Sequence, residues 1–189
     1  MAKYFSISRY SWRWLLVLGL AVACACTGMV AVRPKASSCD CQVAFSPHEE
    51  SLQLVLQGIE NAKKSIRVAA YAFTSKPIAM ALLDAHKRGV DVRVLADSKA
   101  NQRAYSAVTF LANQGVPVRT NDHYAIFHHK FMVIDGEDVE TGSFNYSAAA
   151  ASRNAENVLF LRNVRELAAQ YGAEWQHLWE EGTPVEARY

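Results

Sequence analysis

Apolar and polar residues alternate along this chain with periods that predict helices and strands in turn. The segment 46–59 opens with Ser46-Pro47-His48-Glu49, where a serine N-cap, a proline in the first turn and a glutamate three residues on are typical of a helix start. The apolar residues that follow repeat at helical spacing: Leu52, Val55, Leu56 and Ile59. We therefore predict a helix that is capped by Ser46 and lies on a hydrophobic core.

The same alternation continues through the first half of the chain. Strand-like runs, rich in apolar and β-branched residues, are 65–73, 90–96 and 116–119. Helical stretches, each closed by a glycine, are 77–88 and 101–114. Strands and helices that alternate at this spacing favour right-handed crossovers and a largely parallel sheet covered by helices.

The second half has a different pattern, with strands that follow one another directly. The strand candidates are 131–134, 139–142 and 158–161. The first two are separated by Asp135-Gly136-Glu137-Asp138, which predicts a hairpin turn. An amphipathic stretch over 164–181 predicts a final helix. We expect one α/β domain, with a mixed, largely parallel β-sheet flanked by α-helices.

Composition bounds the number of domains and the kind of partner. The chain has 189 residues, of which 51% are hydrophobic, and this is enough for one well-packed domain but short for two. The formal net charge is +2, yet Lys3, Arg9 and Arg13 precede every acidic residue, which leaves the rest of the chain close to neutral. A site for a polyanion would therefore depend on local clustering of basic residues.

The first 32 residues predict a targeting segment. Basic residues come first, an apolar run covers Trp14 to Ala23, and small residues follow with two Ala-x-Ala sequences, as in a cleaved export signal. Two alternatives stay open: Trp14 to Val32 is about long enough to span a bilayer uncleaved, and Cys24 could carry a lipid. In each case the body is exported, to the periplasm or beyond, or anchored in the membrane.

Residues 33–43 are polar, small and proline-containing, and they predict a linker. Within it, Cys39 and Cys41 are exposed thiols of an arm or, in an oxidising compartment, half-cystines of a disulfide within or between chains. A zinc site is disfavoured because no second cysteine or Cys/His pair stands at ligand spacing.

One short stretch concentrates the chemistry: His128-x-Lys130, four residues, Asp135, six residues, Gly142-Ser143-x-Asn145. Cleavage of a phosphodiester needs a nucleophile, an acid for the leaving oxygen, and cations or donors for the other oxygens. A neutral imidazole is a competent nucleophile near pH 7. On a strand His128 and Lys130 would share a face, as would Ser143 and Asn145.

Other residues near this stretch have alternative interpretations. A carboxylate at Glu156 could bind the far imidazole nitrogen and fix its tautomer, as in a catalytic triad. We expect His129 to be structural, His123 to line the site or to be solvated, and Asp135 to stabilise the turn or to pair with a basic group. A metal on the histidines is disfavoured because the charged Lys130 would repel it and offers no lone pair.

The stretch resembles the HKD signature of the phospholipase D superfamily, a pattern of six residues at set spacing. The resemblance extends from about Val43 to the C-terminus through Ala69-Ala70-Tyr71-Ala72-Phe73-Thr74, Lys87-Arg88-Gly89-Val90-Asp91-Val92 and Glu140-Thr141-Gly142-Ser143-Phe144-Asn145, which are similar to small exported bacterial endonucleases of that superfamily.

The resemblance implies a phospholipase D-like catalytic domain over 44–183 and a covalent phosphohistidine at His128, with no cofactor and no metal. By the same similarity Lys130 and Asn145 bind the phosphate and Ser143 and Glu156 support the histidine. Asp135 and Gly142 are the remaining supporting positions of the pattern.

The single copy of the motif has its own consequence, because the implied mechanism uses two histidines. We expect a homodimer with one shared active site. An endonuclease acting on DNA or RNA is the first expectation, a phospholipase D acting on phosphatidyl lipids at a membrane the second, and a non-catalytic nucleic-acid-binding module of a secretion or conjugation system the third. Candidate contacts to a nucleic-acid backbone are Lys63, Lys64, Lys99, Arg103, Arg119 and Arg153.

Overall fold

The computed structural model describes residues 40–47, 50–102 and 106–188. The strands are β1 Asp40–Phe45, β2 Ser65–Ala70, β3 Asp91–Asp97, β4 Val118–Asn121, β5 Lys130–Ile134, β6 Asp138–Gly142, β7 Asn157–Arg162 and β8 Thr183–Pro184. The helices are α1 Glu50–Asn61, α2 Lys76–Lys87, α3 Ala107–Asn113, α4 Ala148–Ser152 and α5 Arg165–Glu181, with a short 3-10 turn, η1, at Lys99–Asn101.

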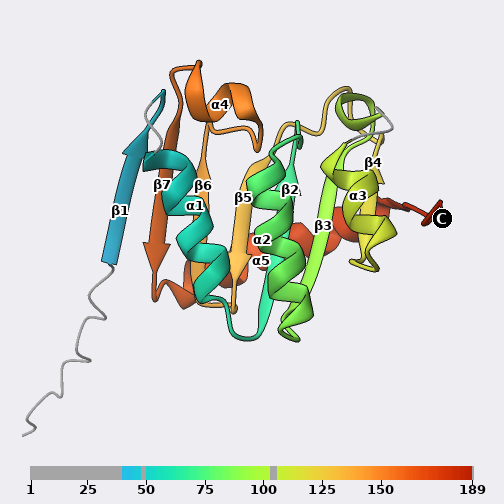
Figure 1. Cartoon of the computed structure of the whole chain (residues 1–189). Helices are drawn as coiled ribbons and strands as arrows, with labels where there is room; N and C mark the ends of the chain where they lie inside the picture. Colours follow the sequence, from blue (N-terminus) through green and yellow to red (C-terminus); the bar gives the residue numbers. More distant parts are fainter. Residues whose placement is uncertain (1–39, 48–49, 103–105, 189) are drawn as a thin grey trace, which may run out of the picture. The chain divides into compact units, whose positions relative to one another are not determined.

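The strands of the described residues form one mixed sheet in the order β1-β7-β6-β5-β2-β3-β4-β8 (Figure 1). Strands β2, β3 and β4 are parallel to one another. The pairs β2–β5, β5–β6, β6–β7, β7–β1 and β4–β8 are antiparallel. A single α/β domain with a helix-flanked mixed sheet is thus confirmed, but the largely parallel pairing that we expected is limited to β2, β3 and β4.

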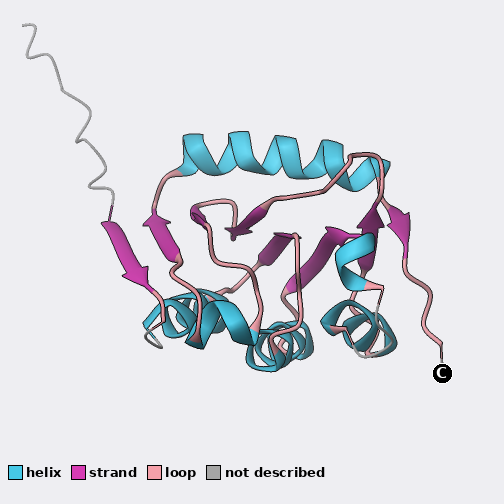
Figure 2. Cartoon of the chain, turned by 90° about the horizontal axis from the view of Figure 1, so that it is seen from above, coloured by secondary structure: helices cyan, strands magenta, loops and turns pink. Residues whose placement is uncertain are grey.

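Helices cover both faces of the sheet: α1, α2 and α3 lie on one face and α5 lies on the other (Figure 2). The two faces carry separate hydrophobic clusters, because successive residues of a strand point to opposite sides. Val68 and Val94 pack toward α1 to α3, whereas their neighbours Ala69 and Leu95 pack toward α5. On the α5 side, the indole nitrogen of Trp175 donates to the carbonyl oxygen of Val68 at 2.9 Å.

The two helix starts compare differently with the expected ones. Helix α1 is described from Glu50, and the expected cap by Ser46 depends on residues 48 and 49, which lie outside the described residues. The Ser46 amide donates to the carbonyl of Glu156 at 3.0 Å, and its buried hydroxyl has no partner among the described residues. Helix α3 begins at Ala107, where the Ser106 hydroxyl accepts from the Thr109 amide at 3.2 Å. A local serine cap therefore outweighs the longer helical pattern that we extended back to residue 101.

The boundary of the expected linker is also corrected. Residues 40–43 belong to β1, which pairs with β7 from Asp40 opposite Arg162 to Phe45 opposite Asn157. The sheet therefore begins four residues before the expected domain start. At the other end, β8 pairs with β4 and carries the domain just past residue 183.

The predicted targeting segment 1–32, Cys39 and Arg103 lie outside the described residues. Among the helices that the structure describes, none is long and apolar enough to span a membrane.

Several strands end or begin at one common edge of the sheet. Strand β5 starts at Lys130 opposite Ala70, the last residue of β2. Strand β6 ends at Gly142 opposite Val158, near the start of β7. The loops after β2 and β6 and before β5 and β7 therefore meet at this edge, which is the upper edge in Figure 1.

Candidate active site

His128 and Lys130 come together around the ring of Tyr71. The centroids of the Tyr71 and His128 rings are 4.7 Å apart, and the Lys130 Nζ lies 5.2 Å from the Tyr71 centroid. Strand pairing begins only at Lys130, so His128 lies in the preceding loop and not on the strand as expected. Tyr71, which directly follows β2, keeps the two side chains together instead of the strand alternation.

The amine of Lys130 is held at the base of this cluster. Its side chain is buried, and its Nζ donates to the carbonyl oxygen of His128 at 2.9 Å. Burial lowers the pKa of Lys130, and the negative charge of Glu156 partly opposes this effect. An ammonium has three donors. In the part of the chain that the structure describes, this carbonyl is the partner of the amine, which leaves donors for an anion.

Ser143 and Glu156 form a second group across the ends of β6 and β7. The Ser143 hydroxyl donates to Glu156 Oε2 at 2.6 Å and accepts from the Asn157 amide at 3.1 Å. The Asn154 side-chain amide donates to Glu156 Oε1 at 2.9 Å. Both carboxylate oxygens are therefore engaged, and no hydrogen bond joins Glu156 to the His128 imidazole among the described residues.

Gly142 and Asn145 flank Ser143 and differ in what they contribute. A Cβ at Gly142 would lie 2.1 Å from the carbonyl oxygen of Asn157, so the close approach of β6 and β7 requires glycine here. Asn145 places its Oδ1 in the interior without a hydrogen-bond partner among the described residues. A buried amide oxygen in this state costs free energy, and such groups are often found where a ligand binds.

Asp135 lies beyond the opposite end of β5 from His128, and the five residues of that strand span about 17 Å. Its carboxylate accepts the backbone amides of Lys63, Lys64 and Ser65 at 2.7 to 3.2 Å. Burial alone would raise the pKa of Asp135, but these donors and the Lys64 charge outweigh it and lower the pKa. The geometry therefore gives Asp135 a structural use and no access to a group bound at His128.

The other histidines near the motif have separate surroundings. His129 packs edge-on between Phe127 and Phe131, with ring centroids 5.3 and 5.5 Å away, and burial lowers its pKa. His123 is exposed in the loop after β4 and meets the Tyr124 ring edge-on, with centroids 5.5 Å apart. Within the described ranges no three His, Cys, Asp or Glu residues are grouped as a metal site would require.

The basic residues expected to contact a nucleic-acid backbone lie at both ends of the strands, some near His128 and some near Asp135. Lys99 in η1 and Arg153 at the end of α4 follow strands that end at the edge of His128. Lys63 and Lys64 lie at the opposite edge, beside Asp135. Arg119 donates to the carbonyl of Trp179 at 2.7 Å and covers its ring, so it serves packing against α5.

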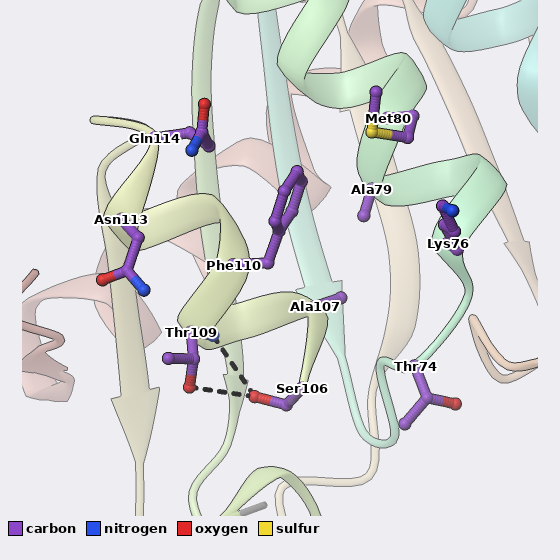
Figure 3. A pocket seen from close by; sticks show the side chains of 10 residues that line it. All are labelled: Thr74, Lys76, Ala79, Met80, Ser106, Ala107, Thr109, Phe110, Asn113 and Gln114. Atoms are coloured by element: carbon purple, nitrogen blue, oxygen red, sulfur yellow. Dashed lines mark hydrogen bonds between the residues drawn. The ribbon is translucent and has the colours of Figure 1, made fainter. Parts of the chain in front are cut away.

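Among the hollows near this edge, two differ clearly in chemistry. One, of about 430 Å³, is lined by His128, Lys130 and Gly142 together with Tyr171 and Glu174 of α5. The other, of about 310 Å³, lies between α2 and α3 and is lined mainly by small, apolar and neutral polar side chains, with Met80 and Phe110 facing it (Figure 3). Only the first of these two contains residues of the motif.

Two residues of the site were missed from the sequence, Tyr71 and Asn154. Tyr71 could have been found from its place directly after a predicted strand, since the carboxyl ends of parallel strands are where sheet proteins bind ligands. Asn154 carries no such signal, because its contact with Glu156 depends on the turn that follows α4.

The geometry agrees with comparison to known proteins. A family described as "Cardiolipin synthase, PLD-like domain" matches residues 55–179. The chain belongs to the phospholipase D superfamily. It is therefore a phosphodiesterase hydrolase of that superfamily, and His128, Lys130 and Ser143 stand within the matched region.

Individual members of the phospholipase D superfamily are similar over most of this chain. A phospholipase D of Rickettsia felis is 36% identical over 144 residues, which cover 76% of this chain and 69% of the relative. The mitochondrial cardiolipin hydrolase of Mus musculus is 32% identical over 152 residues, covering 80% and 67%. The crystal structure of Nuc from Salmonella typhimurium matches with a TM-score of 0.77 and 40% identity, covering 79% of this chain and 99% of Nuc.

Proposed function

We propose that the chain is an endonuclease that cleaves DNA or RNA through a phosphohistidine, without a metal ion, at a site shared by two subunits. The observation that carries the proposal is the grouping of His128, Lys130 and Tyr71 at one edge of the sheet. An exposed imidazole beside a partly desolvated ammonium suits attack on phosphorus, because the ammonium stabilises charge on the phosphoryl oxygens.

The reaction has two steps, each with a balanced proton transfer. A neutral His128 nitrogen attacks phosphorus, the bond to the leaving oxygen breaks, and a second, protonated histidine gives that oxygen its proton. Water then attacks the phosphohistidine, the second histidine takes a proton from it, and the phosphorus–nitrogen bond breaks. Lys130 and Asn145 hold the non-bridging oxygens, while Glu156 and Ser143 support the site from the β7 side.

The second histidine is proposed to be His128 of an identical subunit. An apolar surface beside the site supports this arrangement. Val43 and Phe45 on β1 have exposed fractions of 57% and 58%, and β1 lies outside the span of α5 in Figure 2. Phe45 is opposite Asn157, whose amide binds Ser143, so this surface adjoins the site edge. A two-fold axis near it would bring two such sites together.

Mixed dimers test the shared site. We would mix wild-type chains with His128→Ala chains in equal amounts, exchange subunits by mild denaturation and refolding, and measure activity per wild-type chain. Random pairing puts half of the wild-type chains in mixed dimers, so a shared site predicts a fall to about one half. Unchanged activity per wild-type chain would reject it.

Nucleic acid is the proposed substrate because the match to Nuc, at 40% identity, covers 79% of this chain and 99% of Nuc, and because Lys99 and Arg153 stand at the site edge. The second candidate is a phospholipase D, favoured by the relatives named phospholipase D and mitochondrial cardiolipin hydrolase. A non-catalytic binding module is disfavoured, because binding alone does not require a buried lysine beside an exposed histidine.

One set of assays discriminates these functions. The purified full chain, in EDTA, would be incubated with plasmid DNA and separately with vesicles of phosphatidylcholine and of cardiolipin, with His128→Ala as the control. Cleaved DNA with intact lipid supports the endonuclease, and hydrolysed lipid with intact DNA replaces it by the phospholipase. If neither substrate changes, the catalytic proposal fails.

A further inference from the structure

A buried carboxyl and a buried phenol bind each other directly beneath the site. Glu140, in the middle of β6, has an exposed fraction of 1%, and Tyr146 has one of 0%. The Tyr146 hydroxyl donates to Glu140 Oε2 at 2.6 Å, and Oε1 has no partner among the described residues. The cross-strand neighbours of Glu140 are the apolar Met132 and Phe160.

Tyr146 also joins the two loops that form the site. Its backbone carbonyl accepts the amides of both Thr74 and Ser75 at 2.8 Å. It forms an isolated parallel bridge with Phe73, and the two rings meet edge-on with centroids 5.8 Å apart. Tyr146 directly follows Asn145, and the segment 73–75 that it contacts begins two residues after Tyr71.

Burying a carboxyl and a phenol in a hydrophobic core costs free energy of desolvation. An isolated buried carboxyl loses its hydration, and apolar side chains of similar volume are often at least as stable. Burial raises the pKa of Glu140 to about 8, against the opposing effect of the Tyr146 hydrogen bond. Burial and the nearby carboxyl raise the pKa of Tyr146 as well. Both groups thus keep their protons at neutral pH, and the directed bond between them fixes one geometry.

We propose that Glu140 and Tyr146 are positioning residues of the active site: their bond fixes Ser143 and Asn145 relative to Tyr71 and His128 without touching the substrate. The proposal rests on the proposed phosphodiesterase function. Removing the bond lets the loop after β6 move against the loop after β2, and small displacements of phosphate-binding groups slow the reaction step more than they weaken binding.

The test uses Tyr146→Phe, Glu140→Leu, their double variant and Glu140→Gln, whose amide oxygen can still accept from Tyr146. Val92→Ala is the control, because Val92 is fully buried on β3 near the edge remote from the site. kcat and KM would be measured on bis(p-nitrophenyl) phosphate and plasmid DNA, at a temperature where each variant is folded. Hydrogen exchange would be followed at the amides of Thr74, Ser75 and Ser143.

We expect Tyr146→Phe and Glu140→Leu each to lower kcat about tenfold with KM changed less than threefold, and the double variant to be no worse than either. Glu140→Gln should stay within about threefold of wild type at pH 7, and its contrast with Glu140→Leu, which cannot accept from Tyr146, is a difference that a purely volume-filling role would not give. The Thr74 and Ser75 amides should exchange at least about tenfold faster in Tyr146→Phe, because their acceptor is no longer anchored.

A wild-type kcat in Tyr146→Phe overturns the proposal, as does an equal loss per folded molecule in Val92→Ala. Failure of the proposed function is distinguishable from this. If the wild type cleaves no phosphodiester, hydrogen exchange alone decides: unchanged exchange at Thr74 and Ser75 in Tyr146→Phe overturns the positioning role, and faster exchange supports it.

Discussion

The two ends of strand β5 carry residues of the same short motif, yet they relate to the rest of the chain in opposite ways. At the amino end His128 is exposed, and the Lys130 amine, which donates to the His128 carbonyl oxygen, keeps further donors among the residues that the structure describes. At the carboxyl end, the Asp135 carboxylate accepts the amides of Lys63, Lys64 and Ser65 and is fully engaged.

The difference shows that a motif of fixed spacing can combine chemistry with architecture. Polar groups that are satisfied inside the fold stabilise it, and polar groups that are left unsatisfied are available to a ligand. Substitutions at the two ends should therefore have separate effects, on activity at one end and on stability at the other.

His128→Ala should have the largest effect, and on activity alone. Loss of the proposed nucleophile should reduce the cleavage rate by roughly 10³-fold or more, while the free energy of unfolding changes by less than about 0.5 kcal/mol because the side chain is exposed. Cleavage rates and urea unfolding would measure the two quantities. His123→Ala, another exposed histidine, is the matched control and should change neither.

Asp135→Ala should show the reverse. Three amides lose their acceptor, so the free energy of unfolding should fall by roughly 2–3 kcal/mol while activity per folded molecule stays within about threefold. Asp138→Ala in the same turn removes the acceptor of a single amide, that of Asn163, and should cost less. Equal costs, or a large loss of activity in folded Asp135→Ala, would contradict the separation of the two ends.

The pH dependence sharpens this prediction. The folded-state pKa of Asp135 is lowered, so its stabilisation is present above the pKa of the unfolded chain and is lost as pH falls through the folded-state value. Acid unfolding of Asp135→Ala should therefore begin from a lower stability and be less steep.

Lys130→Met should reduce the cleavage rate by roughly 10²-fold, because it removes the charge proposed to stabilise the phosphoryl oxygens. Stability should stay within about 1 kcal/mol, because burial already disfavours the ammonium at this position and methionine fills a similar volume. Lys87→Met, at the exposed end of α2, controls for loss of positive charge in general. A severe loss of stability would contradict this and would show that Lys130, like Asp135, mainly stabilises the fold.

Glu140→Gln should have the smallest effect at neutral pH and a distinct pH signature. With a folded-state pKa of about 8, the wild type is fully stabilised below the unfolded-state pKa and loses stability as pH rises toward 8. The slope is at most about 1.4 kcal/mol per pH unit for one proton. Glutamine does not titrate, so the free energy of unfolding of Glu140→Gln, measured with urea between pH 5 and about 8, should depend less on pH than that of the wild type. Equal pH dependence in the two proteins would show that Glu140 is not the group that ionises.

Sequence patterns predicted the elements that make up the core, and the reason is physical. The hairpin at Asp135, the glycine ends of α2 and α3, and the amphipathic α5 are all determined by residues within a few positions of one another. The edge strands β1 and β8 were missed, because their pairing depends on β7 and β4, which lie far away in the sequence.

The candidate site likewise has residues that the sequence predicts and contacts that only the folded sheet creates. The motif names His128, Lys130 and Ser143 directly, because the pattern of spacing is itself the signal. Tyr71 joins His128 and Lys130 only after β2 and β5 have paired, and the Ser143 bond to Glu156 replaces the expected bond to the imidazole only after β6 meets β7. These contacts need the register of the sheet, which no local pattern supplies.

Gly142 limits how this site could be transplanted or redesigned. With the Asn157 carbonyl oxygen 2.1 Å from where a Cβ would be, the backbones of β6 and β7 are as close there as a glycine permits. A designer who grafts the histidine, lysine, serine and glutamate onto another sheet would have to reproduce that interstrand spacing first. Gly142 takes no part in the chemistry, yet it is the residue of the motif that an engineered copy would most need to keep.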